Sequence, residues 1–463
     1  MEGDGIEVDD VEARRKDEPQ DSDTLNGGKR EGEKVPLTLP QSSTLEEGLV
    51  EGDARNEVDL TSTTRFCIRI GQAAFLYGSP GPNVERFLEH VMKQHGFYGM
   101  FRATQSELIC SVAKSESELP QTTIVAIECD LDMYKLALLA DLANKVLSME
   151  VTQNDSLIEL DKIAKTQNPW GDPVIWASYV LAGAALANLL GGSWWDILTS
   201  SFGSCLCFLV VLILPKIGNH GAFTKWIHLV AGFVTAAFAS LVQLGLEDLN
   251  VGICTLSAIA ILIPGYTVSV GVAEIVANRI VSGFAKLANG LLVLIWQVVG
   301  AWLGFSFINA VANVPSNENE TESLPMAWQA LFVPLICISL IFVFQVGTRD
   351  APWALLIMGV TYGSFYGFSR LKANNLGVFL STVVLVVIAN GWAKLMNRPA
   401  SLVLVPSLVL QVSGSIGFQG LFHVIEGQAE LGTAQFEQML IIALMIVVGL
   451  LAGNTVLPPG TTL

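Results

Sequence analysis

The feature that most constrains this chain is a series of ten apolar segments between Pro169 and Leu463. These 295 residues carry only 21 charged side chains, whereas about a quarter of a soluble domain is charged. A helix that spans a bilayer needs about 20 mostly apolar residues, so each segment predicts a membrane span. An ordinary soluble enzyme, a nucleic-acid binder and a disulfide scaffold are therefore excluded. The ten predicted spans are residues 173–192, 197–214, 226–246, 250–272, 287–311, 327–347, 351–368, 375–393, 400–421 and 436–457.

Two polar regions precede the spans. Residues 1–59 contain 18 acidic and 7 basic residues, a composition that predicts a disordered acidic tail. Residues 60–168 predict a small cytoplasmic α+β domain, with helices over 64–76, 84–95 and 132–149 and strands near 107–113 and 122–129. Asn83 is expected to cap the second of these helices, and Ser156 to begin a capping box for a fourth.

Positive residues in short loops predict the orientation of the spans, because they favour the cytoplasmic side. With the N- and C-termini in the cytoplasm, seven loop cations lie inside: Lys216, Lys225, Arg279, Lys286, Arg349, Lys394 and Arg398. Two lie outside, Arg370 and Lys372. The glycosylation sequon at Asn319 also falls on the outer side. We therefore expect a multi-pass integral membrane protein; the sequence does not distinguish the plasma membrane from an internal one.

Ten spans divide into two groups of five, residues 169–312 and 313–463, and a five-span repeat must face the opposite way the second time. The predicted fold class is thus membrane all-α, with ten transmembrane helices as two inverted five-helix repeats behind the α+β domain. Pro264-Gly265 in the fourth span and Pro406-Ser407 in the ninth predict matching helix breaks. In transporters such breaks mark the substrate site, since unwound backbone exposes carbonyls and a helix N-terminus. A plain proline kink is the alternative.

Polar residues near these breaks are the candidate site residues. Glu274, Asn278, Ser282 and Lys286 are spaced by four on one predicted helical stripe, lining either a vestibule or a surface. Glu274 is the first candidate proton carrier, or else an ion-pair partner of a nearby base. His423 is the second candidate proton carrier, or else a histidine at the membrane interface without such a role. The candidate substrate-binding residues are Pro264, Gly265, Thr267, Gly271, Pro406, Ser407, Gln411, Ser413 and Gly414, although helix packing explains the polar ones nearly as well.

Several short motifs lie along the segment from Arg69 to Gly420. They are Gly78-Ser79, Asn83-Val84-Glu85-Arg86, Leu262-Ile263-Pro264-Gly265, Gly271-Val272-Ala273-Glu274, Ile280-Val281-Ser282-Gly283 and the stretch from Val405-Pro406-Ser407 to Gly417-Phe418. Through these motifs the segment resembles the threonine/serine exporter family, including its pheromone-regulated membrane protein members, although Ser407 departs from the family's usual Pro-Gly. The resemblance implies a cytoplasmic domain before ten spans, and export of small hydroxy-amino acids driven by an ion gradient, with protons as the expected ion.

The leading hypothesis is therefore a secondary transporter for threonine and serine, not an enzyme. Its expected partners are the lipid bilayer, a small amino acid and a proton, without nucleic acid, metal or cofactor, and an oligomer is possible. A regulatory membrane protein is one alternative. A membrane-attached hydrolase is another; it would need Glu85 or Glu107 with Ser79 or Ser111, which form no recognisable nucleophile–base set.

Overall fold

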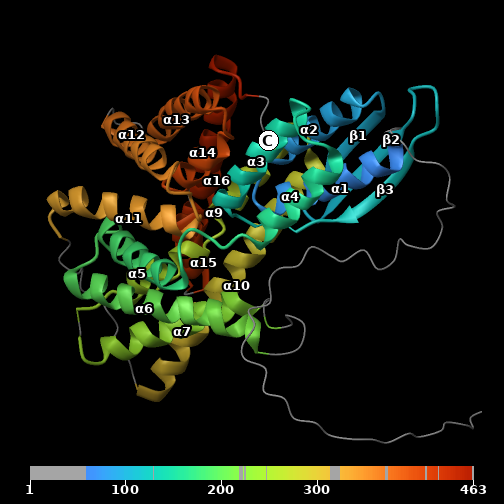
Figure 1. Ribbon diagram of the computed structural model, residues 1–463. Helices are drawn as coiled ribbons and strands as arrows, with labels where there is room; N and C mark the ends of the chain where they lie inside the picture. Colours follow the sequence, from blue (N-terminus) through green and yellow to red (C-terminus); the bar gives the residue numbers. More distant parts are fainter. Residues whose placement is uncertain are drawn as a thin grey trace, which may run out of the picture. The chain divides into compact units, whose positions relative to one another are not determined.

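The structure is a computed structural model that describes residues 59–128, 130–217, 223, 226–246, 248–312, 324–370, 374–411, 414–425 and 427–460. Figure 1 shows a mainly helical chain with a small sheet near its N-terminal end. Residues 1–58 of the predicted tail, the sequon at Asn319 and the cations Lys225 and Lys372 lie outside the described residues.

Four helices and a small sheet open the described chain. Its elements are α1 (Leu60–Leu76), α2 (Gly81–Gln94), β1 (Tyr98–Ala103), β2 (Glu107–Ala113), β3 (Gln121–Ala126), α3 (Met133–Leu147) and α4 (Gln153–Lys165). The strands form an antiparallel sheet in the order β1-β2-β3, with Cys110 opposite both Phe101 and Thr123. Because side chains alternate along a strand, Leu108, Cys110 and Val112 share the buried face of β2 and pack against the helices.

Two helix starts in this unit differ from the prediction. α2 begins at Gly81, before the predicted cap Asn83, because Pro82 fits the first turn, where a helix needs no N–H donor. α4 is capped by the Thr152 side chain, which accepts a hydrogen bond from a backbone N–H. Ser156 lies one turn inside α4 and donates to the Thr152 carbonyl at 2.8 Å. The predicted caps at Asn83 and Ser156 are therefore wrong.

Each of the ten predicted spans falls on helix. The helices are α5 (Asp172–Leu189), α6 (Trp194–Ile213), α7 (Ile227–Gln243), α8 (Val251–Ala258), α9 (Gly265–Val276), α10 (Ile280–Ala312), α11 (Gln329–Val343), α12 (Ala351–Ser369), α13 (Asn374–Met396), α14 (Ser401–Val409), α15 (Gly414–Ile425) and α16 (Ala429–Val456). Short 3₁₀ turns η1 (Leu214–Lys216), η3 (Ala260–Leu262) and η4 (Met326–Trp328) lie between some of them.

Length and composition qualify fewer of these helices as spans. Within the described ranges, six are long and apolar enough to cross a membrane: α6, α10, α11, α13, the α14–α15 segment and α16. The bent pair α8 and α9 makes a seventh if it is counted as one span, and α7 is apolar but shorter. The protein is therefore multi-pass, whereas ten spans remain a prediction.

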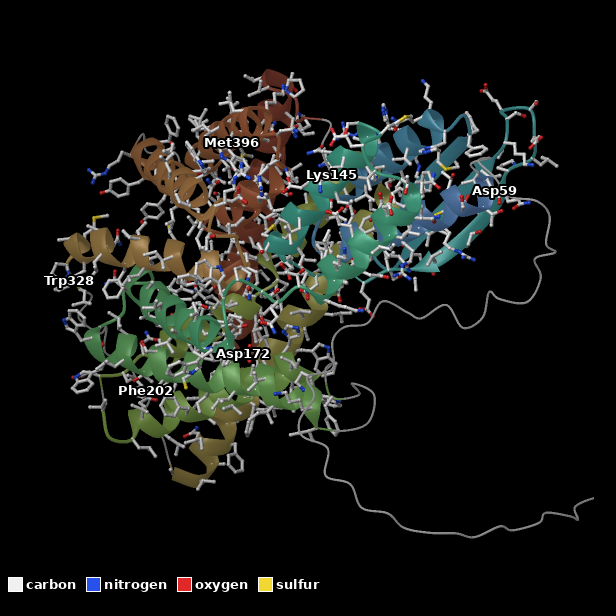
Figure 2. All side chains as sticks on the ribbon, in the orientation of Figure 1. Asp59, Lys145, Asp172, Phe202, Trp328 and Met396 are labelled. Carbon is white, nitrogen blue, oxygen red and sulfur yellow. The ribbon has the colours of Figure 1, made fainter. Side chains whose placement is uncertain are left out.

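The surface of these helices is apolar. Phe202 on α6 and Trp328 next to α11, both labelled in Figure 2, are 64% and 38% exposed. Trp328 packs edge-on against Trp194, with ring centroids 4.9 Å apart. Such a continuous exposed apolar surface is unfavourable in water, whereas lipid solvates it at no cost.

Two pairs of helices keep the same spacing along the sequence. α9 and α15 each have 12 residues, and their first residues, Gly265 and Gly414, are 149 positions apart. α10 and α16 begin at Ile280 and Ala429, again 149 positions apart. This spacing gives each residue of α9 an equivalent in α15, and each of the first 28 residues of α10 an equivalent in α16.

Candidate functional site

The fourth predicted span is a broken helix. α8 ends at Ala258, η3 follows, and α9 begins at Gly265 with the two helices bent by 58°. Pro264 is the N-cap of α9 and makes no side-chain capping bond. Because the first turn of a helix leaves backbone N–H groups unpaired, α9 presents the positive end of its dipole at the break. The break predicted at Pro264 is confirmed.

The ninth predicted span breaks later than expected. Pro406 lies inside α14, which continues to Val409, and α15 begins at Gly414. The matching break predicted at Pro406-Ser407 is therefore wrong in position. Pro406 is the sixth residue of α14, so it removes one interior backbone donor, which membrane helices tolerate as a proline kink. Ser407 is fully buried and donates to the Val403 carbonyl at 2.7 Å, so its hydroxyl is used within α14.

The two breaks touch each other. A Cβ atom built on Gly414 would lie 3.1 Å from the Gly265 Cα and 2.5 Å from the Ile263 Cγ2. The first turns of α9 and α15 therefore approach as closely as backbone allows, and only glycine fits at Gly414. Two helix N-termini consequently point their positive ends into one region, which is a favourable place for a carboxylate.

Matching glycine contacts hold each half-helix to the helix that follows it. A Cβ on Gly271 of α9 would lie 2.9 Å from the Gly283 carbonyl oxygen of α10. Likewise, a Cβ on Gly420 of α15 would lie 2.9 Å from the Gly432 carbonyl oxygen of α16. Both pairs obey the spacing of 149 residues. Gly271, predicted as a substrate-binding residue, thus serves as a helix contact.

Glu274 lies in a buried polar cluster near the end of α9. Its carboxylate accepts from Ser282 Oγ at 2.6 Å and pairs with the Lys286 ammonium group, both on α10. The four predicted stripe residues do not share one helix, because α9 ends at Val276 and Asn278 turns the chain with a φ of +60°. The fold-back of α10 onto α9 still joins three of them. The predicted alternative of an ion pair for Glu274 is therefore confirmed.

His423 occupies the position in α15 that Glu274 occupies in α9, 149 residues earlier. Its Nδ1 lies 2.9 Å from Gln435 Oε1 on α16 and 2.8 Å from the Gln419 carbonyl oxygen. Gln435 is in turn the equivalent of Lys286. The same two positions are therefore in contact in both helix pairs: as the charged pair Glu274–Lys286 in α9 and α10, and as the histidine–amide pair His423–Gln435 in α15 and α16.

A contact that the sequence did not predict connects the α+β unit to this site. Glu85 of α2 is 2% exposed, and it accepts from both terminal nitrogens of Arg279 at 2.8 and 2.6 Å. Arg102 Nη1 and the Ala103 N–H also donate to Glu85, at 3.1 and 2.9 Å. Hydrogen bonding to Glu85 raises the pKa of Arg279. The only signal in the sequence was an arginine within a chain that has very few charges.

This contact also bears on the hydrolase alternative. Because both carboxylate oxygens of Glu85 accept from arginine, they are already occupied and are poorly placed to take a proton from a nucleophile. Ser111 Oγ hydrogen bonds to Thr122 Oγ1 at 2.7 Å, on the sheet. Glu85 and Ser111 are thus held in structural contacts.

The remaining predicted site residues are distributed around the breaks. Thr267 is half-buried in the first turn of α9. Gln411 follows α14 and accepts from Thr382 Oγ1 of α13 at 2.8 Å. Ser413 lies outside the described residues. The structure therefore joins Gly265 with Gly414, and Glu274 with its two α10 partners, but keeps Pro406 within its own helix.

Apolar helices with lipid-compatible surfaces, interrupted where two half-helices meet, define a multi-pass integral membrane protein. Two family models match the chain: "Putative threonine/serine exporter" over residues 65–308 and "Threonine/Serine exporter, ThrE" over residues 329–456. The chain belongs to the threonine/serine exporter family, as its motifs predicted. This is a family of transporters rather than of enzymes.

Curated relatives come from fungi. The chain is 21% identical to the pheromone-regulated membrane protein 10 of Candida glabrata over 370 residues, which cover 78% of this chain and 46% of the relative. It is 22% identical to the Saccharomyces cerevisiae protein of the same name over 369 residues, covering 78% and 47%. The chain spans about half the length of these relatives. No solved structure gives a significant match.

Proposed function

We propose that this protein is a secondary transporter that exports small hydroxy-amino acids, threonine and serine, in exchange for protons. The observation that carries the proposal is the meeting of two broken helices at Gly265 and Gly414, in a member of an exporter family. Substrate sites of secondary transporters lie where discontinuous helices of two repeats meet.

The proposed architecture is ten spans in two inverted repeats, residues 169–312 and 313–463, behind the acidic tail (1–59) and the α+β domain (60–168). The spacing of 149 residues between α9–α10 and α15–α16 supports the repeat. Helix packing supports it too, because α7 packs on α10 as α13 packs on α16, and α16 contacts α9 as α10 contacts α15. A repeat of five spans is necessarily inverted.

Contacts of the α+β domain support the proposed orientation, with both termini in the cytoplasm. Glu85 binds Arg279 after the fourth span, the Met133 N–H donates to the Phe344 carbonyl at the end of α11 in the sixth at 3.0 Å, and Asp141 pairs with Arg398 after the eighth at 3.3 Å. Three loops separated by even numbers of predicted spans therefore lie beside one domain, as a ten-span chain requires.

In the proposed site, the substrate carboxylate lies at the N-termini of α9 and α15, and the unwound backbone before Gly265 offers carbonyls to the ammonium group. Glu274 is the proposed proton carrier. A carboxylate that exchanges between the Lys286 ion pair and a protonated form couples proton binding to movement of α9 against α10. His423 is the proposed second proton site, in the equivalent position of α15.

The experiment is counterflow and gradient-driven uptake of labelled threonine and serine in proteoliposomes. We expect wild-type flux that an imposed pH gradient accelerates. Glu274→Gln should abolish the response to the gradient, because an amide cannot carry the proton. Glu430→Gln is the matched control, since this carboxylate is exposed in the first turn of α16 and should leave the response unchanged.

Either half of the proposal can fail separately. Folded wild-type protein that moves neither amino acid would refute the cargo and favour the regulatory alternative. Flux that ignores the pH gradient would refute proton coupling while leaving amino-acid transport intact. A gradient response retained in Glu274→Gln would move the proton carrier away from Glu274.

A further inference from the structure

Each helix break has a buried glutamine with one unsatisfied amide atom. Gln297 of α10 is completely buried, and its Nε2 donates to the Leu262 carbonyl at 2.8 Å, at the α8–α9 break. Its Oε1 is buried, and no donor among the described residues reaches it. Gln297 therefore fixes one end of its amide on the unwound backbone and leaves an acceptor open.

Gln411 has the opposite atom of its amide group open: the donor rather than the acceptor. It is 8% exposed and lies three residues before the start of α15. Its Oε1 accepts from Thr382, whereas its buried Nε2 has no acceptor within the described part of the chain. One break thus offers a free acceptor and the other a free donor, each held in place by the other end of its amide.

The two amides are related through residues of the two breaks. Gln297 binds Leu262, the next residue Ile263 lies against Gly414, and Gly414 is close in sequence to Gln411. Ser269 on α9 adds a third buried polar group, 2% exposed, whose hydroxyl has no partner among the described residues. Buried polar atoms in proteins are almost always hydrogen-bonded, so these open groups beside two helix N-termini fit a polar ligand.

We infer that Gln297 and Gln411 are a pair of recognition residues for the two charged ends of an α-amino acid. Gln297 Oε1 accepts from the ammonium group, and Gln411 Nε2 donates to the carboxylate beside the positive end of α15. Ser269 is the partner for a side-chain hydroxyl. The inference rests on the proposed function and specifies which residues of the site read the substrate.

The test uses the full chain in proteoliposomes, with inhibition of labelled threonine counterflow by two analogues. Threoninol lacks the carboxylate, and 3-hydroxybutanoate lacks the ammonium group. Wild-type protein should prefer threonine to both. Gln411→Leu should lower the apparent affinity for threonine at least tenfold and leave that for threoninol unchanged, because only threonine loses a bond. Gln297→Leu should do the same with 3-hydroxybutanoate as the unaffected analogue.

Gln438→Leu is the matched control, because the Gln438 donor is already occupied by Asn375 at 3.1 Å. It should affect all three compounds equally. If either leucine variant fails to fold, Gln411→Glu and Gln297→Met replace it with side chains of similar size. Gln411→Glu turns the open donor into an acceptor and should lower threonine affinity more than threoninol affinity.

The outcomes separate the two proposals. Loss of the preference for threonine over threoninol in Gln411→Leu, and over 3-hydroxybutanoate in Gln297→Leu, supports the two glutamines as recognition residues. Threonine transport with wild-type discrimination in both variants overturns the inference and leaves the proposed function standing. The absence of threonine transport in folded wild-type protein overturns both.

Discussion

Replacing Arg279 by glutamine should release the α+β domain from the turn between α9 and α10. The change removes both guanidinium donors from Glu85, whose side chain is 3% exposed. Removing one partner of a buried ion pair costs about 3–5 kcal/mol. Glu85 keeps Arg102 and the Ala103 N–H as donors. We therefore expect a smaller cost at this site, about 2–3 kcal/mol.

The assay is amide hydrogen exchange of the purified protein, read by mass spectrometry over α2. A loss of about 2–3 kcal/mol corresponds to exchange about 30 to 140 times faster. Arg86→Gln is the control, because Arg86 lies next to Glu85 on α2 and is exposed. The double variant with Glu85→Gln should lose less than the sum of the two single changes.

The pH dependence of this contact follows from the direction in which the pKa of Arg279 is shifted. Pairing with Glu85 raises the pKa of Arg279, so the contribution of Arg279 is fully present below the ordinary arginine pKa. It is lost only as the pH rises through the raised value. Protection of α2 should therefore be constant between about pH 6 and 9. Equal exchange in Arg279→Gln and wild type, or in Arg279→Gln and Arg86→Gln, would refute the reasoning.

Three further predictions test the packing and the break. Gly283→Ala should destabilise the protein by about 1–3 kcal/mol, because the new Cβ would lie 2.6 Å from a facing carbonyl oxygen. The measurement is the midpoint of thermal unfolding in detergent, and Gly359→Ala, which has open space around it, is the neutral control. Equal midpoints for the two variants would contradict the prediction. Pro264→Ala should slow threonine flux more than Pro406→Ala, since only Pro264 lies at a break; the reverse order would move the site. Burial raises the pKa of Cys110 to about 11, so iodoacetamide at pH 8 should leave it unmodified in folded protein, as peptide mass spectrometry can check; rapid labelling would show that the sheet opens.

The sequence predicted those parts of the molecule that local pattern determines. Helices lie in each of the ten apolar segments over the residues that the structure describes, β2 has its predicted bounds, and the break at Pro264 is in place. Apolar run length, strand alternation and proline chemistry act over a few residues, so they can be read directly. β1 escaped prediction because Gly99 interrupts its alternating pattern.

The parts that failed depend on residues distant in sequence. Glu85 and Arg279 are separated by 194 positions, and neither has a local motif that names its partner. Pro406 resembled Pro264 in its neighbours, yet the contact of Gly414 with Gly265 fixes the second break elsewhere. The polar residues from Glu274 to Lys286 looked like one stripe, because a regular spacing of four does not show that the chain turns at Asn278.

α10 has 33 residues, which at 1.5 Å a residue gives a rod of about 50 Å. The hydrocarbon layer is only about 30 Å thick, and even a tilt of about 40°, the upper end of the observed range, leaves roughly 38 Å along the membrane normal if the helix is straight. About two turns must therefore stand outside the lipid. At one end Arg279 fastens α10 to the α+β domain through Glu85. A change in bilayer thickness, or a force exerted by the α+β domain on the protruding turns, would therefore tilt α10 as a whole.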